Sequence, residues 1–201
     1  MRKNGILVPA VAGILLLSAC AGQPSSLPST NPAPLPSTSA SPFPSDTPTP
    51  PPVDPDAPEG QCQNASLSVE VQLEDGAAGS RYSNIVFTNT GTTECALRGY
   101  PGVSVVGHGN GTQLGAPADR TPAPDGLSTV QLPPGSTAIA VLQETNIGDG
   151  GGPLAGNCEV ETGDGYRIYP PHSFDAVLVE AAVPACASGA VWMYVGAVAA
   201  G

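Results

Sequence analysis

Positive charge is scarce in this sequence, and so are aromatic side chains. Its 201 residues include 6 Lys and Arg against 17 Asp and Glu, which gives a net charge of −11. Proteins that bind nucleic acid neutralise phosphates with cationic side chains, so this composition argues against nucleic acid as a partner. Charged residues reach only 11% and aromatic residues 4%. Solubility must therefore come from Ser, Thr, Asn and Gln.

Histidine is also rare, which limits the catalytic chemistry that the chain can support. The two histidines are His108, in a Gly-rich segment expected to form a hairpin tip, and His172, which follows two prolines. Neither has a visible partner in the sequence, and no Ser lies in a Gly-x-Ser-x-Gly elbow. The sequence thus offers no nucleophile and base for acyl transfer, and it indicates no cofactor.

No apolar run is long enough to cross a bilayer, which takes about 20 residues. The longest run, residues 6–17, follows Arg2 and Lys3. Its last residue begins the sequence Leu-Ser-Ala of residues 17–19, which directly precedes Cys20. This arrangement is typical of a secretory signal. The small residues before Cys20 resemble the bacterial lipobox, which predicts a lipoprotein signal peptide over residues 1–19. The resemblance implies a diacylglyceryl thioether on Cys20. The alternative is an ordinary secretory signal with an incidental cysteine.

Cleavage would remove the only lysine and one arginine. Four arginines then remain against 17 acidic residues, a net charge of −13. Such a chain is repelled by anionic lipid head groups, so electrostatics cannot hold it at a membrane. The lipid on Cys20 is therefore expected to be the whole anchor, on the outer face of the cell membrane.

Residues 20–60 are predicted to form a disordered stalk behind the lipidated cysteine. Positions 21–60 contain 13 Pro and 11 Ser or Thr, with hardly an aliphatic residue to bury. Such a composition favours extended polyproline II conformations and cannot build a core. The stalk would carry the following domain away from the membrane.

Residues 61–201 are long enough for one domain with its own core. Leu67, Val69, Val71 and Leu73 alternate with polar residues, as in a half-buried strand. Eight strands are predicted, at residues 67–73, 83–88, 103–107, 129–132, 137–143, 166–169, 176–183 and 190–198. Gly and Pro turns separate them, and no stretch keeps a helical period. We expect an all-β fold, an antiparallel immunoglobulin-like β-sandwich, with an antiparallel barrel as the alternative.

Four cysteines follow Cys20, an even number in an exported chain, so two disulfides are expected. Three pairings are possible. We favour Cys62 with Cys95 and Cys158 with Cys186, because each pair closes a local loop, of 33 and 28 residues. Dispersed spacing argues against a zinc site.

Several short motifs resemble an actinobacterial family of exported domains of unknown function, the DUF4232 family. They are the Phe-Thr-Asn-Thr-Gly of residues 87–91, Cys95, the Leu-Arg-Gly-Tyr-Pro-Gly-Val-Ser of residues 97–104 and the Leu-Pro-Pro-Gly of residues 132–135. Cys158 and Cys186 fall where the family places its second cysteine pair. The resemblance implies a secreted or lipid-anchored β domain, and it brings no catalytic residue, ligand or cofactor.

Three candidate sites remain in the predicted domain. Asp119, Glu144 or Asp164 would serve a hydrolase or transferase if two of them faced each other. Asp149, together with Glu159, Glu161 and Asp164, offers oxygens to Ca²⁺, although a solvated acidic rim is the plainer interpretation. Trp192 and Tyr194 share one face of the last predicted strand. They either pack inward, which composition favours, or form an exposed binding patch with Tyr169.

These observations predict a non-catalytic binding or scaffold module, presented outside the membrane on a lipid-anchored stalk. An unknown envelope ligand or protein would be its partner. The alternative is an envelope hydrolase or transferase that uses paired carboxylates.

Overall fold

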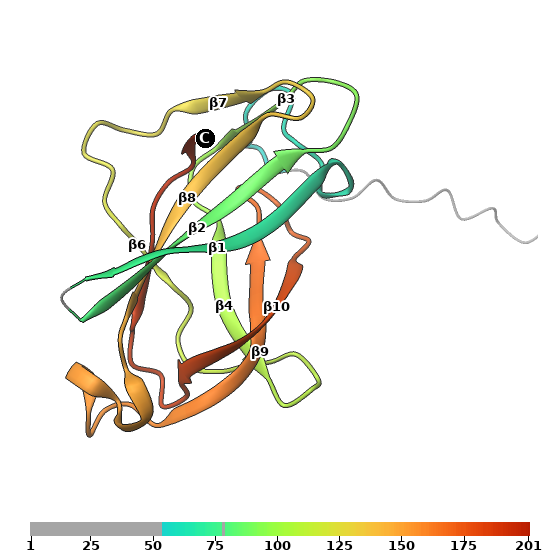
Figure 1. Cartoon of the computed structure of the whole chain (residues 1–201). Coiled ribbons are helices and arrows are strands. Elements are labelled where there is room, and N and C mark those ends of the chain that lie inside the picture. Colours follow the sequence, from blue (N-terminus) through green and yellow to red (C-terminus); the bar gives the residue numbers. More distant parts are fainter. Residues whose placement is uncertain (1–53, 78) are drawn as a thin grey trace, which may run out of the picture. The chain divides into compact units, whose positions relative to one another are not determined.

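The computed structural model describes residues 54–77 and 79–201, which form an all-β sandwich (Figure 1). The expected signal peptide, Cys20 and most of the expected stalk lie outside the described residues. The strands are β1 (Leu67–Ala77), β2 (Ser80–Asn89), β3 (Cys95–Arg98), β4 (Gly102–Gly107), β5 (Thr112–Gln113), β6 (Asp119–Arg120), β7 (Thr129–Leu132), β8 (Thr137–Thr145), β9 (Val160–Tyr169), β10 (Val177–Cys186), β11 (Met193–Val195) and β12 (Ala199–Ala200). Three single-turn 3₁₀ helices accompany them, η1 (Asn64–Ser66), η2 (Gly148–Gly150) and η3 (Gly152–Leu154).

The larger sheet has the strand order β1-β2-β8-β11-β6, with β12 also paired to β8. All of these pairs are antiparallel except β11 with β6. Strand β2 shows why the sheet has two different faces. Ile85 and Phe87 are buried and alternate with half-buried residues, so one face meets the core and the other meets solvent.

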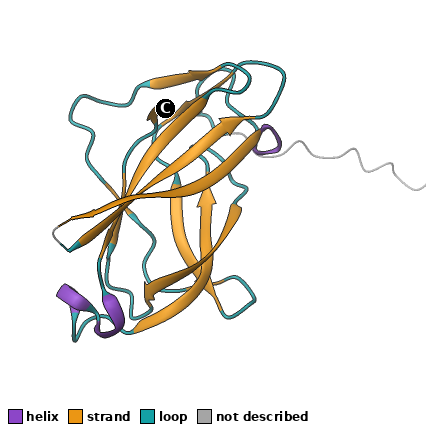
Figure 2. Cartoon of the chain, in the orientation of Figure 1, coloured by secondary structure: helices purple, strands orange, loops and turns teal. Residues whose placement is uncertain are grey.

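The smaller sheet has the order β10-β9-β4-β5 and lies behind the first in Figure 1. Strands β3 and β7 form a separate two-stranded ladder. Colouring by secondary structure shows how little helix accompanies the strands (Figure 2). Both main sheets are open, so the structure is the predicted sandwich and not the barrel.

The core is one cluster that joins the two main sheets. Phe87 and Leu142 of the larger sheet belong to it together with Val105, Tyr166 and Ile168 of the smaller one. Each fully buried side chain of this size stabilises the fold by about 1.5–3 kcal/mol. Aromatic rings are few in this chain. Small and branched aliphatic residues therefore supply most of the contact in the core.

Glycines allow the close approaches that the second sheet requires. A Cβ on Gly165, in the centre of β9, would collide with the carbonyl oxygen of Val179 on the neighbouring strand. A Cβ on Gly115 would collide with the backbone of Cys186. These glycines are needed for space between backbones, which composition alone does not reveal.

The predicted strands correspond to observed ones, with differences at their ends. Strand β7 has the predicted bounds, whereas β9 begins six residues earlier than predicted, at Val160. The predicted last strand, residues 190–198, is wrong as one element, because only Met193–Val195 and Ala199–Ala200 pair with β8. Strand β3 was not predicted; it is only four residues long and begins at the disulfide cysteine Cys95. Within the described part of the chain, no helix is long and apolar enough to span a membrane.

Candidate functional site

Two disulfides fasten the ends of the sandwich. Cys62 is bonded to Cys95 and Cys158 to Cys186, with Cα–Cα distances of 4.8 and 5.0 Å. This is the favoured pairing. The first bond joins the segment that enters the domain to β3, and the second joins the loop before β9 to the end of β10.

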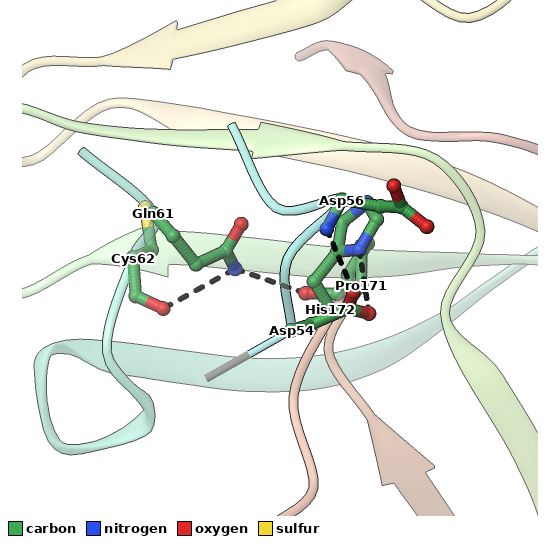
Figure 3. Close-up of polar contacts among 6 residues, drawn as sticks. All are labelled: Asp54, Asp56, Gln61, Cys62, Pro171 and His172. Carbon is green, nitrogen blue, oxygen red and sulfur yellow. Dashed lines mark hydrogen bonds and ion pairs between the residues drawn. The ribbon is translucent and has the colours of Figure 1, made fainter. Parts of the chain in front are cut away.

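A small pocket lies where the chain enters the domain. Its volume is about 180 Å³. Two segments far apart in sequence form it, residues 54–64 and residues 172–175. Figure 3 shows part of this junction pocket, where residues 54–62 approach the loop of Pro171 and His172.

The imidazole of His172 holds the entering segment. Its Nδ1 lies 2.9 Å from Oδ2 of Asp54, and the backbone N–H of Asp56 donates to Oδ1 of the same carboxylate at 2.9 Å (Figure 3). The hydrogen bond from Asp56 and then that from His172 lower the pKa of Asp54 below its usual 3.8. His172 has φ +58°, a left-handed conformation that is rare for a residue with a side chain. His172 thus has a partner after all, 118 positions away, which no local pattern could indicate.

Further hydrogen bonds join the two segments of the junction pocket. The Nε2 of Gln61 donates to the carbonyl of Pro171 at 2.9 Å, and Nδ2 of Asn64 donates to the carbonyl of Asp175 at 2.6 Å. Ser173 follows His172 directly, yet its hydroxyl donates to Oδ1 of Asn64 at 2.8 Å. No hydrogen bond between this hydroxyl and the imidazole is present among the described contacts, so the pair does not have the geometry of a nucleophile and its base.

Of the three candidate carboxylates, Glu144 lies in the core. It is 1% exposed, and it accepts hydrogen bonds from Nη2 of Arg81 at 2.9 Å and from the hydroxyl of Tyr166 at 2.8 Å. Tyr166 belongs to β9, so this bond crosses between the two sheets. Burial, followed by the negative charge of Glu144, raises the pKa of Tyr166. The group has the form of a buried structural ion pair.

The other two carboxylates lie elsewhere. Asp119 is exposed on the edge strand β6, and Asp164 is exposed on β9, where it accepts from the N–H of Gly109 at 2.7 Å. The structure therefore does not bring the three candidates together. Of the residues proposed for Ca²⁺, Glu161 lies 3.6 Å from Nε2 of His108. Across residues 54–77 and 79–201, no three His, Cys, Asp or Glu side chains are grouped closely enough to hold a metal.

The exposed aromatic patch, the alternative to the inward packing that composition favours, is not formed. Trp192 is 1% exposed, Tyr194 is 38% exposed, and Tyr169 lies on the other sheet. The prediction that Trp192 and Tyr194 share one face of a strand is wrong, because β11 begins only at Met193. The neighbour of Tyr194 on its own face is Gln143 of β8, and Tyr82 of β2 is the next residue in that row. Sequence reasoning did not find Tyr82 as a site residue.

The comparisons with known proteins identify a family and nothing finer. The family model described as "Domain of unknown function (DUF4232)" matches residues 62–199. No curated protein and no solved structure matches the chain. Since the match covers most of the chain and all of the described strands apart from the last residue of β12, the protein belongs to the DUF4232 family.

Proposed function

We propose that this protein is a lipid-anchored extracytoplasmic lipoprotein whose β-sandwich is a non-catalytic binding or scaffold module. One observation carries the proposal. The four cysteines of the described domain are bonded to each other in pairs, so none of them is available to pair with Cys20. Disulfides persist in oxidising compartments, where a free exposed thiol is a liability. A lipid on Cys20 removes that liability and explains its position directly after the apolar run.

The geometry of the titratable groups supports a binding module over an enzyme. Glu144 is enclosed by Arg81 and Tyr166, and Asp164 is engaged with a hairpin backbone. The imidazole of His172 is paired with Asp54 at the point where the chain enters the domain. Each of these groups makes a contact that fastens one part of the fold to another.

Cell fractionation tests the anchor. The wild-type protein is expected in the membrane fraction and to be released by detergent, whereas Cys20→Ala is expected in the culture fluid or as an uncleaved precursor. Ser25→Ala, in the predicted stalk, is the matched control and should fractionate as the wild type does. An intact mass of the wild-type protein should exceed that of residues 20–201 by the mass of the acyl groups. A Cys20→Ala protein that has lost residues 1–19 and still fractionates with the membrane would refute the proposal.

A further inference from the structure

The solvent side of the larger sheet carries an uncharged surface with two tyrosines. We call it the outer tyrosine face; it consists of Tyr82, Asn84, Val86, Val141, Gln143 and Tyr194. Direct strand partners share a face of a sheet, and Gln143 is the partner of both tyrosines. Val141 is 45% exposed and Tyr194 is 38% exposed, so this face is open to solvent in the described residues.

The two tyrosines are separated by one strand, β8. Neighbouring strands lie about 4.8 Å apart, which places the two positions about 9.6 Å from each other across the sheet. Between them, Nε2 of Gln143 donates to Oγ of Ser80 at 3.3 Å, which fixes the orientation of the amide. The row thus alternates ring, amide and ring. Asn84 and Val141, which are direct partners, form the next row.

The charges around this face indicate what kind of ligand fits it. None of the four arginines of residues 20–201 lies in it: Arg81 turns to Glu144, Arg120 lies over the ring of Tyr100, and Arg98 and Arg167 are on other sheets. Carboxylates flank the face on both sides: Glu70 is the strand partner of Val86, and Asp119 is that of Tyr194. In the backbone register, Asp75 is the strand partner of Tyr82. The carboxylate of Glu74 also accepts a hydrogen bond from Nδ2 of Asn84 at 2.8 Å. Anionic polymers are therefore repelled, while carboxylates and amides can accept hydrogen bonds from hydroxyl groups.

The geometry points to a binding site for an extended, uncharged, β-linked glycan on the outer tyrosine face. The sugar rings pack their C–H faces on Tyr82 and Tyr194. Their hydroxyls donate to the side-chain oxygens of Gln143 and Asn84 and to the flanking carboxylates, since Nδ2 of Asn84 is already bonded to Glu74. Alternate sugars of an extended β-1,4-linked chain repeat at a distance close to the separation of the tyrosines. The six side chains are far fewer than the roughly 20–30 residues per partner of a stable protein interface.

Calorimetric titration of the full chain, purified in detergent, tests this site with chitohexaose and cellohexaose as β-1,4-linked probes and an α-linked dextran oligosaccharide as control. Saturable binding of at least one β-linked probe is expected, and none of dextran. Tyr82→Ala and Tyr194→Ala should each weaken binding by about tenfold. Tyr194→Phe keeps the ring and should retain most of the affinity. Thermal melting of each variant checks that the fold is kept.

Phe174→Ala is the matched control, because Phe174 is an aromatic residue, 59% exposed, that lines the junction pocket. It should bind as the wild type does. The site is overturned if neither β-linked probe binds at millimolar concentration, if the tyrosine variants bind unchanged, or if Phe174→Ala loses binding equally. Self-association abolished by Tyr194→Ala would also overturn it, since a second copy would then occupy the face. These outcomes leave the Cys20 test untouched, so the two proposals fail separately.

Discussion

Removing Arg81 should destabilise the fold more than removing Glu144, because the two partners of this ion pair are buried to different extents. Arg81 is 37% exposed and Glu144 is 1% exposed. Without Glu144, the guanidinium can turn to water. Without Arg81, the carboxylate stays in the core with only Tyr166 as a recorded hydrogen-bond donor. A charge left unpaired in the interior is the more costly outcome.

Arg81→Met keeps the length of the stem and removes the charge, and we expect it to lower the free energy of unfolding at pH 7 by about 3 kcal/mol. Glu144→Gln keeps an acceptor for the hydroxyl of Tyr166 and leaves an arginine that can hydrate. Its cost should be about 1–2 kcal/mol. The double variant contains no buried charge, so it should be more stable than Arg81→Met alone.

Urea unfolding, followed by the fluorescence of Trp192, measures these differences in the free energy of unfolding. Trp192 is buried and is the only tryptophan in the sequence. Its carbonyl accepts a hydrogen bond from the N–H of Thr145, which is next to Glu144. The slope of each transition must stay constant for the free energies to be compared. The double-mutant cycle gives the interaction energy of the pair. The reasoning is refuted if Arg81→Met is as stable as Glu144→Gln, or if the double variant is no more stable than Arg81→Met.

Three further predictions concern pH and the disulfides. Because the pKa of Tyr166 is raised in the fold above 10.0, through burial and the charge of Glu144, its contribution to stability is complete below pH 10 and is lost as the pH rises further. Tyr166→Phe should therefore have a flatter decline in urea midpoints above pH 10. The pKa of Asp54 is lowered, by a backbone amide and then by the imidazole, so its contribution is present above pH 3.8 and is lost as the pH falls below that value. The stability difference between wild type and Asp54→Asn should disappear in acid, and a constant difference across an acid titration would contradict this. Replacing Cys158 and Cys186 together by Ser opens a 28-residue loop and should cost about 3.6 kcal/mol in urea unfolding, whereas an unchanged midpoint would show that the bond contributes nothing.

Local patterns were sufficient for most of the fold. The alternation from Leu67 to Leu73 predicted β1, and the Gly-rich segment around His108, expected to form a hairpin tip, is the turn between β4 and β5. Each of these signals depends on neighbours within a few residues, which is what propensity and period can report. The disulfide pairing followed from a different property of the sequence, the shorter loops that these two pairs close.

Features that depend on distant partners could not be predicted. The junction pocket brings Asp54 to His172 across 118 positions, and Glu144 meets Tyr166 only because two sheets stack. Glu144 shows the difficulty well. It lies two residues after Leu142 on the same face of β8, so its place on the core face was predictable, but the arginine and phenol that make this burial tolerable were not.

Tyr82 is a further residue whose role depends on a distant partner, because strand register places it in the proposed glycan site. In the sequence, Tyr194 stands two residues after Trp192, and that spacing predicts a shared face of one strand. Register instead pairs Tyr194 with Gln143, and Gln143 with Tyr82, which is 112 positions from Tyr194. A one-residue shift of β8 would turn Gln143 into the core and Glu144 onto the face, which would both break the ion pair and separate the tyrosines by a charge. The Glu144 contacts in the core therefore also maintain the register on which the outer tyrosine face depends.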